Sequence, residues 1–381
     1  MTSTDIVVIG GGIGGVSAAA RLAAAGASVV LVEAEPTLAY HTTGRSAAQY
    51  LENYGNDTVR RLTLATKPFL EPFLGPRPLL QVGGETRVDE LRERVAHAVQ
   101  LVPSTEFIDG RTARSIFPLL AQSIAGALYE PDSRDIDVAA FHQEYVRWFR
   151  AEGGSILTAA PVHTMTRQGA RWQVIAGDHH LEATVVVNAA GAWGDRIGAM
   201  AGAAPIGLHP LRRTIAIAAI PEDHDPATVA RWPLTSFEPD SGPMIGYCKP
   251  EPGGLMVSPA DETPSEPCDA KPEEIDVALG LHHLSQYTTL DVRHVRSTWA
   301  GLRTFTADRT PVSGFDPVVE GLYWQVGQGG YGIHTADALA QAAAATIEGG
   351  AWPRLLSDHG LRPADIGANR ASLDGPLVEG H

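Results

Sequence analysis

Residues 5–33 read DIVVIGGGIGGVSAAARLAAAGASVVLVE, with two apolar runs on either side of a glycine-rich turn and an alanine-rich segment. The first five residues form the apolar run of a buried strand, and Gly10–Gly15 is a glycine-rich turn. Val16–Ala25 is rich in alanine, as expected of a helix, and Gly26 ends it. A second apolar run, Ser28–Glu33, predicts another buried strand. A strand, a helix and a parallel strand within about 30 residues form a βαβ unit.

The glycines of this turn, Gly10, Gly12 and Gly15, form a GxGxxG motif. In such a motif the first glycine permits a tight turn, the second lets the backbone approach a pyrophosphate, and the third lets helix and strand pack closely. The helix N-terminus adds N–H donors and partial positive charge. Glu33 can accept hydrogen bonds from ribose hydroxyls. These features predict a dinucleotide site rather than an accidental glycine turn, although the motif alone does not separate NAD from FAD.

Two later turns favour FAD. The run Val185–Trp193, VVVNAAGAW, looks like the second strand and turn of FAD proteins related to glutathione reductase. Gly327–Gly332, GQGGYG, precedes a predicted helix, Thr335–Ile347, whose start could face the flavin pyrimidine ring and favour its reduced anion. The chain has no second GxGxxG motif, so a separate NAD(P)H domain is not expected.

Further motifs follow the glycine turn in a set order. They are YHTTGRSAAQY (Tyr40–Tyr50), NAAGAW, GYCKPEPGG (Gly246–Gly254), TWAGLRTFTADRTPVSG (Thr298–Gly314) and GQGGYG. In order and spacing, over nearly its whole length, the chain resembles the D-amino acid oxidase superfamily of flavoproteins. It is most similar to the bacterial D-amino acid dehydrogenases of that superfamily, those for D-arginine in particular.

The resemblance implies an α/β fold with a discontinuous Rossmann-like FAD-binding domain of the glutathione-reductase type. An interleaved α+β substrate domain, built on an antiparallel sheet, is expected beside it. The FAD-binding segments are expected to be residues 1–77, 140–203 and 301–381, and the substrate-binding segments residues 78–139 and 204–300. Helical periodicity predicts helices at Leu91–Leu101 and Asp137–Glu152, whereas the Pro- and Gly-rich residues 206–299 predict a sheet with irregular loops.

The resemblance also implies a reaction, the oxidative deamination of a D-amino acid. The neutral amine lies beneath the flavin, hydride leaves the α-carbon for flavin N5, and the imino acid hydrolyses to a 2-oxo acid and ammonia. The electron acceptor is expected to be a quinone, another carrier or oxygen. Some oxidases of the superfamily tether the flavin through a cysteine just after the carboxylate-binding region. This chain has no cysteine beyond Cys268, so FAD is expected to be held non-covalently.

The expected cofactor contacts come from the glycine turn, the end of the second strand, the loop after it and the later motifs. They are Gly10, Gly12, Ile13, Gly14, Gly15, Glu33, Ala34, Thr43, Gly44, Arg45, Ser46, Ala47, Ala48, Gln49, Val162, Ala190, Gly191, Trp193, Gly301, Arg303, Gly329, Gly330, Tyr331, Gly332 and Ile333. Where this chain has Gln49, the most similar dehydrogenases have a histidine. Since an amide does not titrate near neutral pH, the substrate and the pH behaviour are expected to differ.

Three residues are expected to bind the substrate carboxylate. Arg303, in WAGLR, supplies a planar, permanently charged fork that suits a carboxylate, with a surface ion pair as the alternative. Tyr247 and Tyr54 could each donate a hydroxyl or shape the pocket, with a place in the apolar core as the alternative.

Other candidates are weaker. Glu85, in GGETRV, could pair with a basic substrate side chain, or could be an ordinary surface glutamate. Arg212 and Arg213 could add a second cation beside the carboxylate, although two adjacent arginines more often form a solvated edge. His334 could lie near the flavin or simply begin a helix.

Composition limits the function classes. The chain has 381 residues and a net charge of -15, which disfavours a nucleic-acid partner. Two cysteines, Cys248 and Cys268, are too few for a disulfide framework and have no metal-ligand spacing, so a cytoplasmic enzyme without a metal is expected. No run is long and apolar enough for a membrane span, and the first strand begins too early to leave room for a signal peptide. The polar tail from Ser372 is expected to fray.

Three alternatives stay open. The same fold and arginine would serve a glycine- or sarcosine-type secondary-amine oxidase that releases hydrogen peroxide. A flavin-binding subunit without catalysis is a second alternative, which the presence of Arg303 and both tyrosines disfavours. A NAD(P) dehydrogenase is the least favoured of the three.

Overall fold

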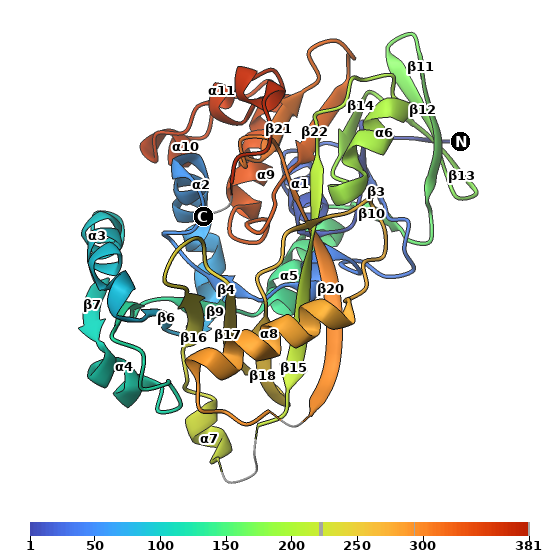
Figure 1. The fold of residues 1–381 in the computed structure, drawn as a ribbon. Coiled ribbons are helices and arrows are strands. Elements are labelled where there is room, and N and C mark those ends of the chain that lie inside the picture. Colours follow the sequence, from blue (N-terminus) through green and yellow to red (C-terminus); the bar gives the residue numbers. More distant parts are fainter. Residues whose placement is uncertain (221–223, 293, 380–381) are drawn as a thin grey trace.

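A computed structural model describes residues 1–220, 224–292 and 294–379 of the protein. At its centre lies a six-stranded sheet with the order β10-β3-β2-β14-β22-β21, whose first five strands are parallel (Figure 1). These strands are β2 (Ile6–Ile9), β3 (Val29–Val32), β10 (Ser155–Leu157), β14 (Val185–Asn188), β21 (Val312–Phe315) and β22 (Leu322–Val326). Because α1 (Ile13–Ala24) joins the parallel strands β2 and β3, the predicted βαβ unit is confirmed.

Helices cover one face of this sheet, and a second sheet covers the other. Helices α1, α5 (Val138–Ala151) and α9 (Ala336–Ile347) pack together on the first face (Figure 1). On the opposite face, Trp172 of a four-stranded sheet packs in one apolar cluster with Trp324 of β22. That sheet contains β1 (Thr2–Ser3), β11 (Val162–Gln168), β12 (Arg171–Ala176) and β13 (His179–Ala183). Since both faces of β2 and β3 are covered, their sequences are continuous apolar runs.

The largest sheet has the order β19-β15-β18-β17-β16-β6-β8-β7, with β20 paired along β15. All its neighbours are antiparallel except β16 and β6. Its strands are β6 (Leu79–Gly83), β7 (Glu106–Asp109), β8 (Gly126–Glu130), β15 (His209–Ala218), β16 (Leu234–Glu238), β17 (Gly246–Glu251), β18 (Gly254–Ser258), β19 (Thr263–Pro264) and β20 (Val295–Phe305). This is the mainly antiparallel sheet that the resemblance implied, and the α/β fold class is confirmed.

Residues 206–299 differ from expectation at one place, because they contain the helix α8 (Glu274–Tyr287) as well as strands. This helix lies along β15, β17 and β18 (Figure 1). Only Gly280 and Leu284 are buried on it. Its apolar stripe is therefore narrow, so hydrophobic periodicity gave little sign of the helix.

A separate three-stranded sheet has the order β4-β9-β5. Its strands are β4 (Gln49–Tyr50), β5 (Leu74–Pro76) and β9 (Arg134–Ile136). Strand β20 pairs with β15 from Val295 to Phe305 and so crosses the expected domain boundary at residues 300 and 301 without interruption. The domain boundaries as such stay a prediction.

The remaining helices are short, apart from two. They are α2 (Asp57–Leu70), α3 (Val88–Ala98), α4 (Gly110–Ile116), α6 (Gly194–Met200), α7 (Pro226–Val229), α10 (Arg354–Asp358) and α11 (Pro363–Ile366), with 3-10 turns at Thr42–Arg45, Glu71–Phe73, Glu85–Arg87, Gly191–Trp193 and Ala371–Asp374. Within the described parts of the chain, no helix combines the length and apolar character that crossing a membrane requires.

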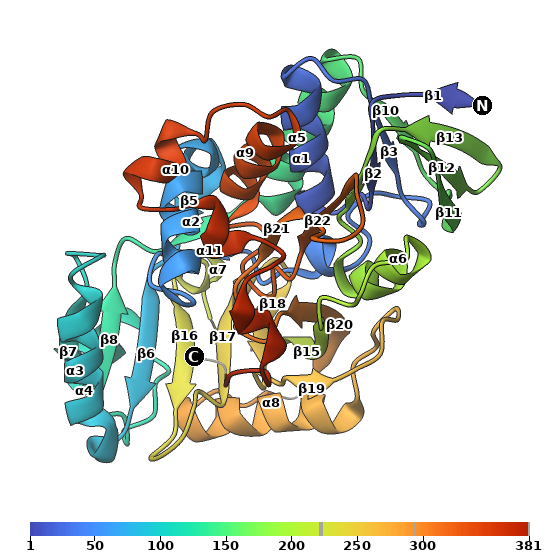
Figure 2. The same ribbon diagram turned by 90° about the horizontal axis from the view of Figure 1, so that it is seen from above.

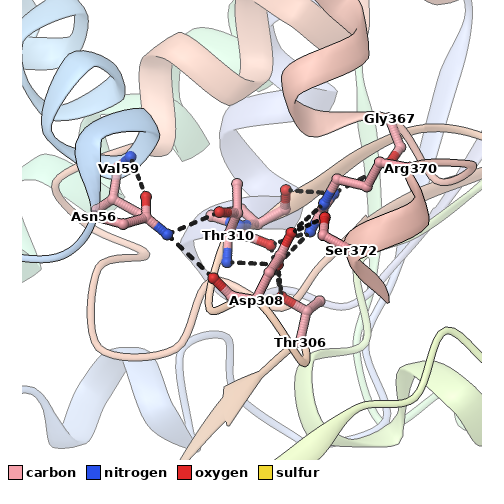
Figure 3. A network of polar contacts seen from close by, with 9 residues as sticks. Asn56, Val59, Thr306, Asp308, Thr310, Gly367, Arg370 and Ser372 are labelled. Atoms are coloured by element: carbon pink, nitrogen blue, oxygen red, sulfur yellow. Dashed lines mark hydrogen bonds and ion pairs between the residues drawn. The ribbon is translucent and has the colours of Figure 1, made fainter. Parts of the chain in front are cut away.

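The C-terminal segment is anchored rather than frayed. Arg370 donates to both carboxylate oxygens of Asp308, at 2.7 and 2.9 Å, and the Ser372 hydroxyl donates to the same carboxylate (Figure 3). Asn56, at the start of α2, donates to the Asp308 carbonyl at 3.2 Å. As far as residue 379, where the described part of the chain ends, the expectation that the tail frays from Ser372 was wrong, because these polar contacts supply what its polar sequence lacks in apolar burial.

Candidate active site

A cavity of about 540 Å³ runs between the central sheet and the largest sheet. The turns after β2, β3 and β14 line one end of it, and side chains of β15, β17 and β20 line the other. Figure 2 shows β15 and β20 below β2, β3 and β22 of the central sheet. The carboxyl ends of parallel strands are where α/β folds bind dinucleotides, so the cavity lies where the glycine motif predicts a ligand.

The first end of the cavity is built by the glycine turn. Gly10 has a φ of +113°, which favours glycine, and a Cβ at Gly15 would lie 1.9 Å from the Gly10 carbonyl oxygen. Gly12 is the N-cap of α1 and has no capping side chain, so the partial positive charge of this helix N-terminus faces a ligand without a side chain in between. The hydroxyl of Thr43 accepts a hydrogen bond from the Ile13 N–H at 3.0 Å.

Glu33 lies at the same end of the cavity. Its Oε2 accepts from the Gly11 N–H at 2.6 Å, and its Oε1 accepts from the Glu35 N–H at 2.9 Å. These two bonds orient the carboxylate, and each oxygen keeps a lone pair for another donor. The arrangement suits a ribose with two adjacent hydroxyls.

Arg45 ties the loop after β3 to the largest sheet. It lines the cavity and donates to the carbonyl oxygens of Ala300 at 2.8 Å and Ala270 at 3.1 Å. It also donates to Asp269 at 2.5 Å, and hydrogen bonds from Lys271 and Arg45 lower the pKa of Asp269 to about 2. The Arg45 side chain therefore fixes the loop after β3 and is not free to bind the ligand.

The second end of the cavity carries two guanidinium groups. In the register of β15 and β20, Arg213 lies opposite Gly301, and Leu211 lies opposite Arg303. Side chains two residues apart on a strand share a face, so Arg213 and Arg303 are diagonal neighbours within reach of each other. Both arginines line the cavity together with Gly301 and with Tyr247 of β17.

Arg303 faces the cavity with few partners. Its Nη1 donates to the Tyr54 hydroxyl at 3.3 Å, and among the described residues no carboxylate pairs with it. Burial would lower the pKa of Arg303, but the tyrosines Tyr54 and Tyr247 and the Glu262 carboxylate raise it above its ordinary value. The group is therefore a permanent cation, open to an anionic ligand.

Tyr247 lies between these cations with its side chain buried. Its hydroxyl has no hydrogen-bond partner among the described residues. Burial alone would raise the pKa of Tyr247, but the charges of Arg303 and Arg213 lower it below its ordinary value. A buried hydroxyl without a partner is costly, so this one is suited to bind a ligand group.

His334 adds no charge to the cavity. Burial and the nearby charge of Arg303 lower the pKa of His334 to about 4. A hydrogen bond to the Gln49 carbonyl partly offsets this shift. Since Nε2 faces that carbonyl, Nε2 carries the proton and Nδ1 is an acceptor with no partner among the described residues. Gln49 itself donates to the Arg77 carbonyl and the Ser133 hydroxyl and is buried beneath the cavity wall.

Most of the residues expected at the site meet in this cavity. Those that line it are Gly10, Gly12, Ile13, Gly14, Glu33, Ala34, Thr43, Arg45, Ser46, Ala47, Val162, Ala190, Gly191, Trp193, Tyr247, Gly301, Arg303, Gly329, Gly330, Gly332 and Ile333. Those outside its lining are Gly15, Gly44, Ala48, Gln49, Tyr54, Glu85 and Tyr331. Tyr54 still contacts Arg303, whereas Glu85 lies exposed in the turn Glu85–Arg87, apart from the other candidates.

Some lining residues were not expected from the sequence. Ile215, Gln328 and Tyr40 line the cavity, and Arg213 is buried in it rather than on a solvated edge. Alternation along β15 was the available signal, because Leu211, Arg213 and Ile215 share one face while Arg212 points the other way. Arg212 pairs with Glu273 and with Asp276 of α8.

The residues present fit FAD. The glycine turn leaves backbone open for a pyrophosphate, Glu33 is oriented for a ribose, and the cavity continues past Gly330 to Arg303. A Cβ at Gly330 would lie 3.0 Å from the Tyr54 hydroxyl and 3.3 Å from Arg303 Nη1, so this position brings the backbone close to the carboxylate-binding candidates. In the described residues, no group of three or more His, Cys, Asp or Glu is placed to hold a metal ion.

Comparison with known proteins gives relatives in sequence and in structure. The tRNA 5-methylaminomethyl-2-thiouridine biosynthesis bifunctional protein MnmC of Burkholderia pseudomallei (strain 1710b) is 27% identical over 409 residues, covering 92% of this chain and 57% of that protein. The chain thus spans less than three fifths of the length of the curated relatives that it matches. Glycine oxidase from Geobacillus kaustophilus has a TM-score of 0.78 at 19% identity, over 92% of this chain and 96% of its own.

L-proline dehydrogenase from P. horikoshii also has a TM-score of 0.78, at 22% identity, over 95% of this chain and 100% of its own. At such identities the structural likeness shows the fold alone. The family model described as FAD dependent oxidoreductase matches residues 5–346. Because that match covers most of the chain and the cavity fits the cofactor, this chain is an enzyme of the FAD-dependent oxidoreductase (DAO) family.

Proposed function

We propose that this enzyme oxidises an amino acid or a related amine that carries a carboxylate. The observation that carries the proposal is Arg303, a cation that faces the cavity without a carboxylate partner among the described residues. Arg213 and the unpartnered hydroxyl of Tyr247 lie beside it. A guanidinium fork and a phenol are donors that match a carboxylate, and a neutral substrate would leave Arg303 without an anionic partner.

The charge distribution of the cavity also suits the amine. Its acidic lining residues, Glu33 and Glu35, belong to the end that fits the ribose, and the substrate end carries Arg213 and Arg303. Positive charge nearby disfavours a second cation, so the cavity favours the neutral form of the substrate amine. FAD, when bound, supplies the hydride acceptor. Arg303, Arg213 and Tyr247 hold the substrate so that its α-carbon has one orientation.

The oxidative deamination of a D-amino acid to an imino acid, and then to a 2-oxo acid and ammonia, is the finer form of this proposal. A basic side chain such as that of D-arginine finds no support at the substrate end, because Glu85 is exposed and does not line the cavity. We therefore propose a neutral or acidic amino acid. With a net charge of -15, a small molecule is a better candidate than the tRNA named in the sequence relatives.

A secondary-amine oxidase is the alternative. It is supported by the fold likeness to a glycine oxidase and an L-proline dehydrogenase, whose named substrates are small and carry a carboxylate. The same arginines would serve either reaction. Release of hydrogen peroxide in air would identify an oxidase, and turnover only with a quinone or dye would identify a dehydrogenase.

The substitution Arg303→Lys tests the proposal. Lysine keeps the charge and loses the fork, so kcat/KM for the best amino acid substrate should fall about 100-fold or more, while the FAD content stays unchanged. Arg212→Lys is the matched control, because Arg212 pairs with α8 and does not line the cavity. Equal effects of the two substitutions would contradict a carboxylate site at Arg303.

A further inference from the structure

Glu262 lies behind Arg213 and does not line the cavity. Arg213 Nη2 donates to Glu262 Oε1 over 3.4 Å, a long contact, while its Nε donates to the Asp261 carbonyl at 2.7 Å. A full ion pair with Glu262 would neutralise Arg213. The long distance shows that this pair is only partly formed.

Arg309 holds the same carboxylate far more firmly. Its Nη2 donates to Glu262 Oε2 at 2.5 Å, and its Nη1 donates to Oε1 at 3.2 Å. Two parallel bonds of this kind fix a carboxylate in direction as well as in distance. Arg213 and Arg309 therefore compete for Oε1, and Arg309 has the better geometry.

Arg309 is itself held in place from two other directions. Its Nε donates to the Val378 carbonyl at 2.8 Å, and its guanidinium lies 4.3 Å from the centre of the Phe305 ring. The Val378 N–H in turn donates to the Ala307 carbonyl at 2.8 Å. Arg309 is buried, so these contacts leave its side chain little freedom to release Glu262.

We propose that Arg309 is a positioning residue that holds Glu262 back from Arg213 and so keeps the Arg213 guanidinium available to an anionic substrate group. The inference rests on the proposed carboxylate site. The proposal predicts that Glu262, next to the site, weakens the binding of an anionic substrate group. Arg309, behind Glu262, strengthens that binding. Burial, together with the charge of Arg303, lowers the pKa of Arg213, which agrees with a cation that lacks a full counterion.

The test compares holoenzyme with Arg309→Met, Glu262→Gln and the double variant, and Arg212→Met is the matched control. Benzoate is the probe and benzamide is its neutral analogue, each titrated against the absorbance of the bound flavin. In Arg309→Met, Glu262 should pair with Arg213, and the Kd for benzoate should rise about tenfold. In the double variant the Kd should return to within about threefold of wild type, because the competing carboxylate is gone.

A purely structural role of Arg309 makes a different prediction, since Glu262→Gln would not repair lost contacts to Val378 and Phe305. An unrepaired double variant, or an unchanged Arg309→Met, overturns the inference. If Arg309→Met does not fold, Glu262→Gln alone decides, because it should bind benzoate as tightly as wild type or more tightly. Weaker binding by that variant also overturns the inference. Failure of wild type to bind any carboxylate overturns the proposed function itself and the inference with it.

Discussion

At the scale of single residues, the site is defined by polar groups that lack partners. Arg303 faces the cavity with one hydrogen bond, to Tyr54, and the Tyr247 hydroxyl has none among the described residues. Leaving a buried hydroxyl unpaired costs free energy, so its place beside two cations in a cavity indicates binding rather than stability. The substitution of Tyr247 is therefore expected to separate these two roles.

Tyr247→Phe should raise KM for a carboxylate-bearing substrate about tenfold and leave the free energy of unfolding nearly unchanged, because the lost hydroxyl has no protein partner. Its pKa is lowered from the ordinary tyrosine value, so the phenolate forms at a lower pH than usual. A phenolate repels a carboxylate, and affinity should decline on the alkaline side. Steady-state kinetics against pH would show this decline in wild type and not in Tyr247→Phe. A decline of equal size in both would contradict the assignment.

The sequence predicted much of this site and missed part of it for physical reasons. The glycine motif predicted Glu33, because such turns have a local signature, and the resemblance implied Arg303 and Tyr247; all three line the cavity. Composition did not show which of the adjacent residues Arg212 and Arg213 faces the cavity. The burial of Arg213 depends on the pairing of β15 with β20. The pairing of Glu85 with a basic substrate side chain was expected from the resemblance alone, and Glu85 is exposed to solvent.

At the scale of elements, the contact between β2 and α1 carries the dinucleotide site. A Cβ at Gly15 would lie 1.9 Å from the Gly10 carbonyl oxygen, so helix and turn could not both keep their places. This contact was predictable from the glycine spacing. The helix α8 was not, because its apolar stripe is narrow and its packing partners are far away in the sequence.

Gly15→Ala should reduce stability by roughly 3 kcal/mol and largely abolish FAD binding, because the clash is with backbone and not with a flexible side chain. Gly75→Ala is the matched control, since no atom lies within 4 Å of a Cβ there and its φ is not positive. FAD affinity by fluorescence quenching and unfolding by urea would measure the two effects. Normal FAD affinity in Gly15→Ala would refute this role of the turn.

At the scale of the whole molecule, the C-terminal segment is fastened to the loop between β20 and β21. Asp308 is the centre of this network, with Arg370 and Ser372 on one side and Asn56 at the start of α2 on the other (Figure 3). The network brings together three parts of the chain that are far apart in sequence. No local pattern in the sequence predicted this network, because each of its polar residues, taken alone, is typical of an exposed tail or loop.

Asp308→Asn should lower the free energy of unfolding by about 2 to 3 kcal/mol at pH 7, less than for a fully buried pair because Asp308 is partly exposed. Burial would raise the pKa of Asp308, but Arg370 and Ser372 lower it below the ordinary value. The Asp308 carboxylate therefore contributes to the free energy of unfolding above the ordinary carboxyl pKa. This contribution is lost as pH falls through the lowered pKa. Urea unfolding at pH 7 and pH 3 would show the difference shrinking in acid, and Arg354→Met, at an exposed ion pair, is the control. An equal loss at both pH values would argue against an ionic network.

We propose that Arg303, Arg213 and Tyr247 hold a substrate with an amine and a carboxylate for oxidation by FAD. Anaerobic titration of the holoenzyme with D- and L-amino acids, N-methyl amino acids and the matching decarboxylated amines tests it most directly. The visible absorbance of the oxidised flavin is expected to bleach with at least one carboxylate-bearing amine and not with its decarboxylated form. Neutral or acidic substrates should bleach it faster than D-arginine. Bleaching by amines regardless of the carboxylate, or by none of the panel, would contradict the account.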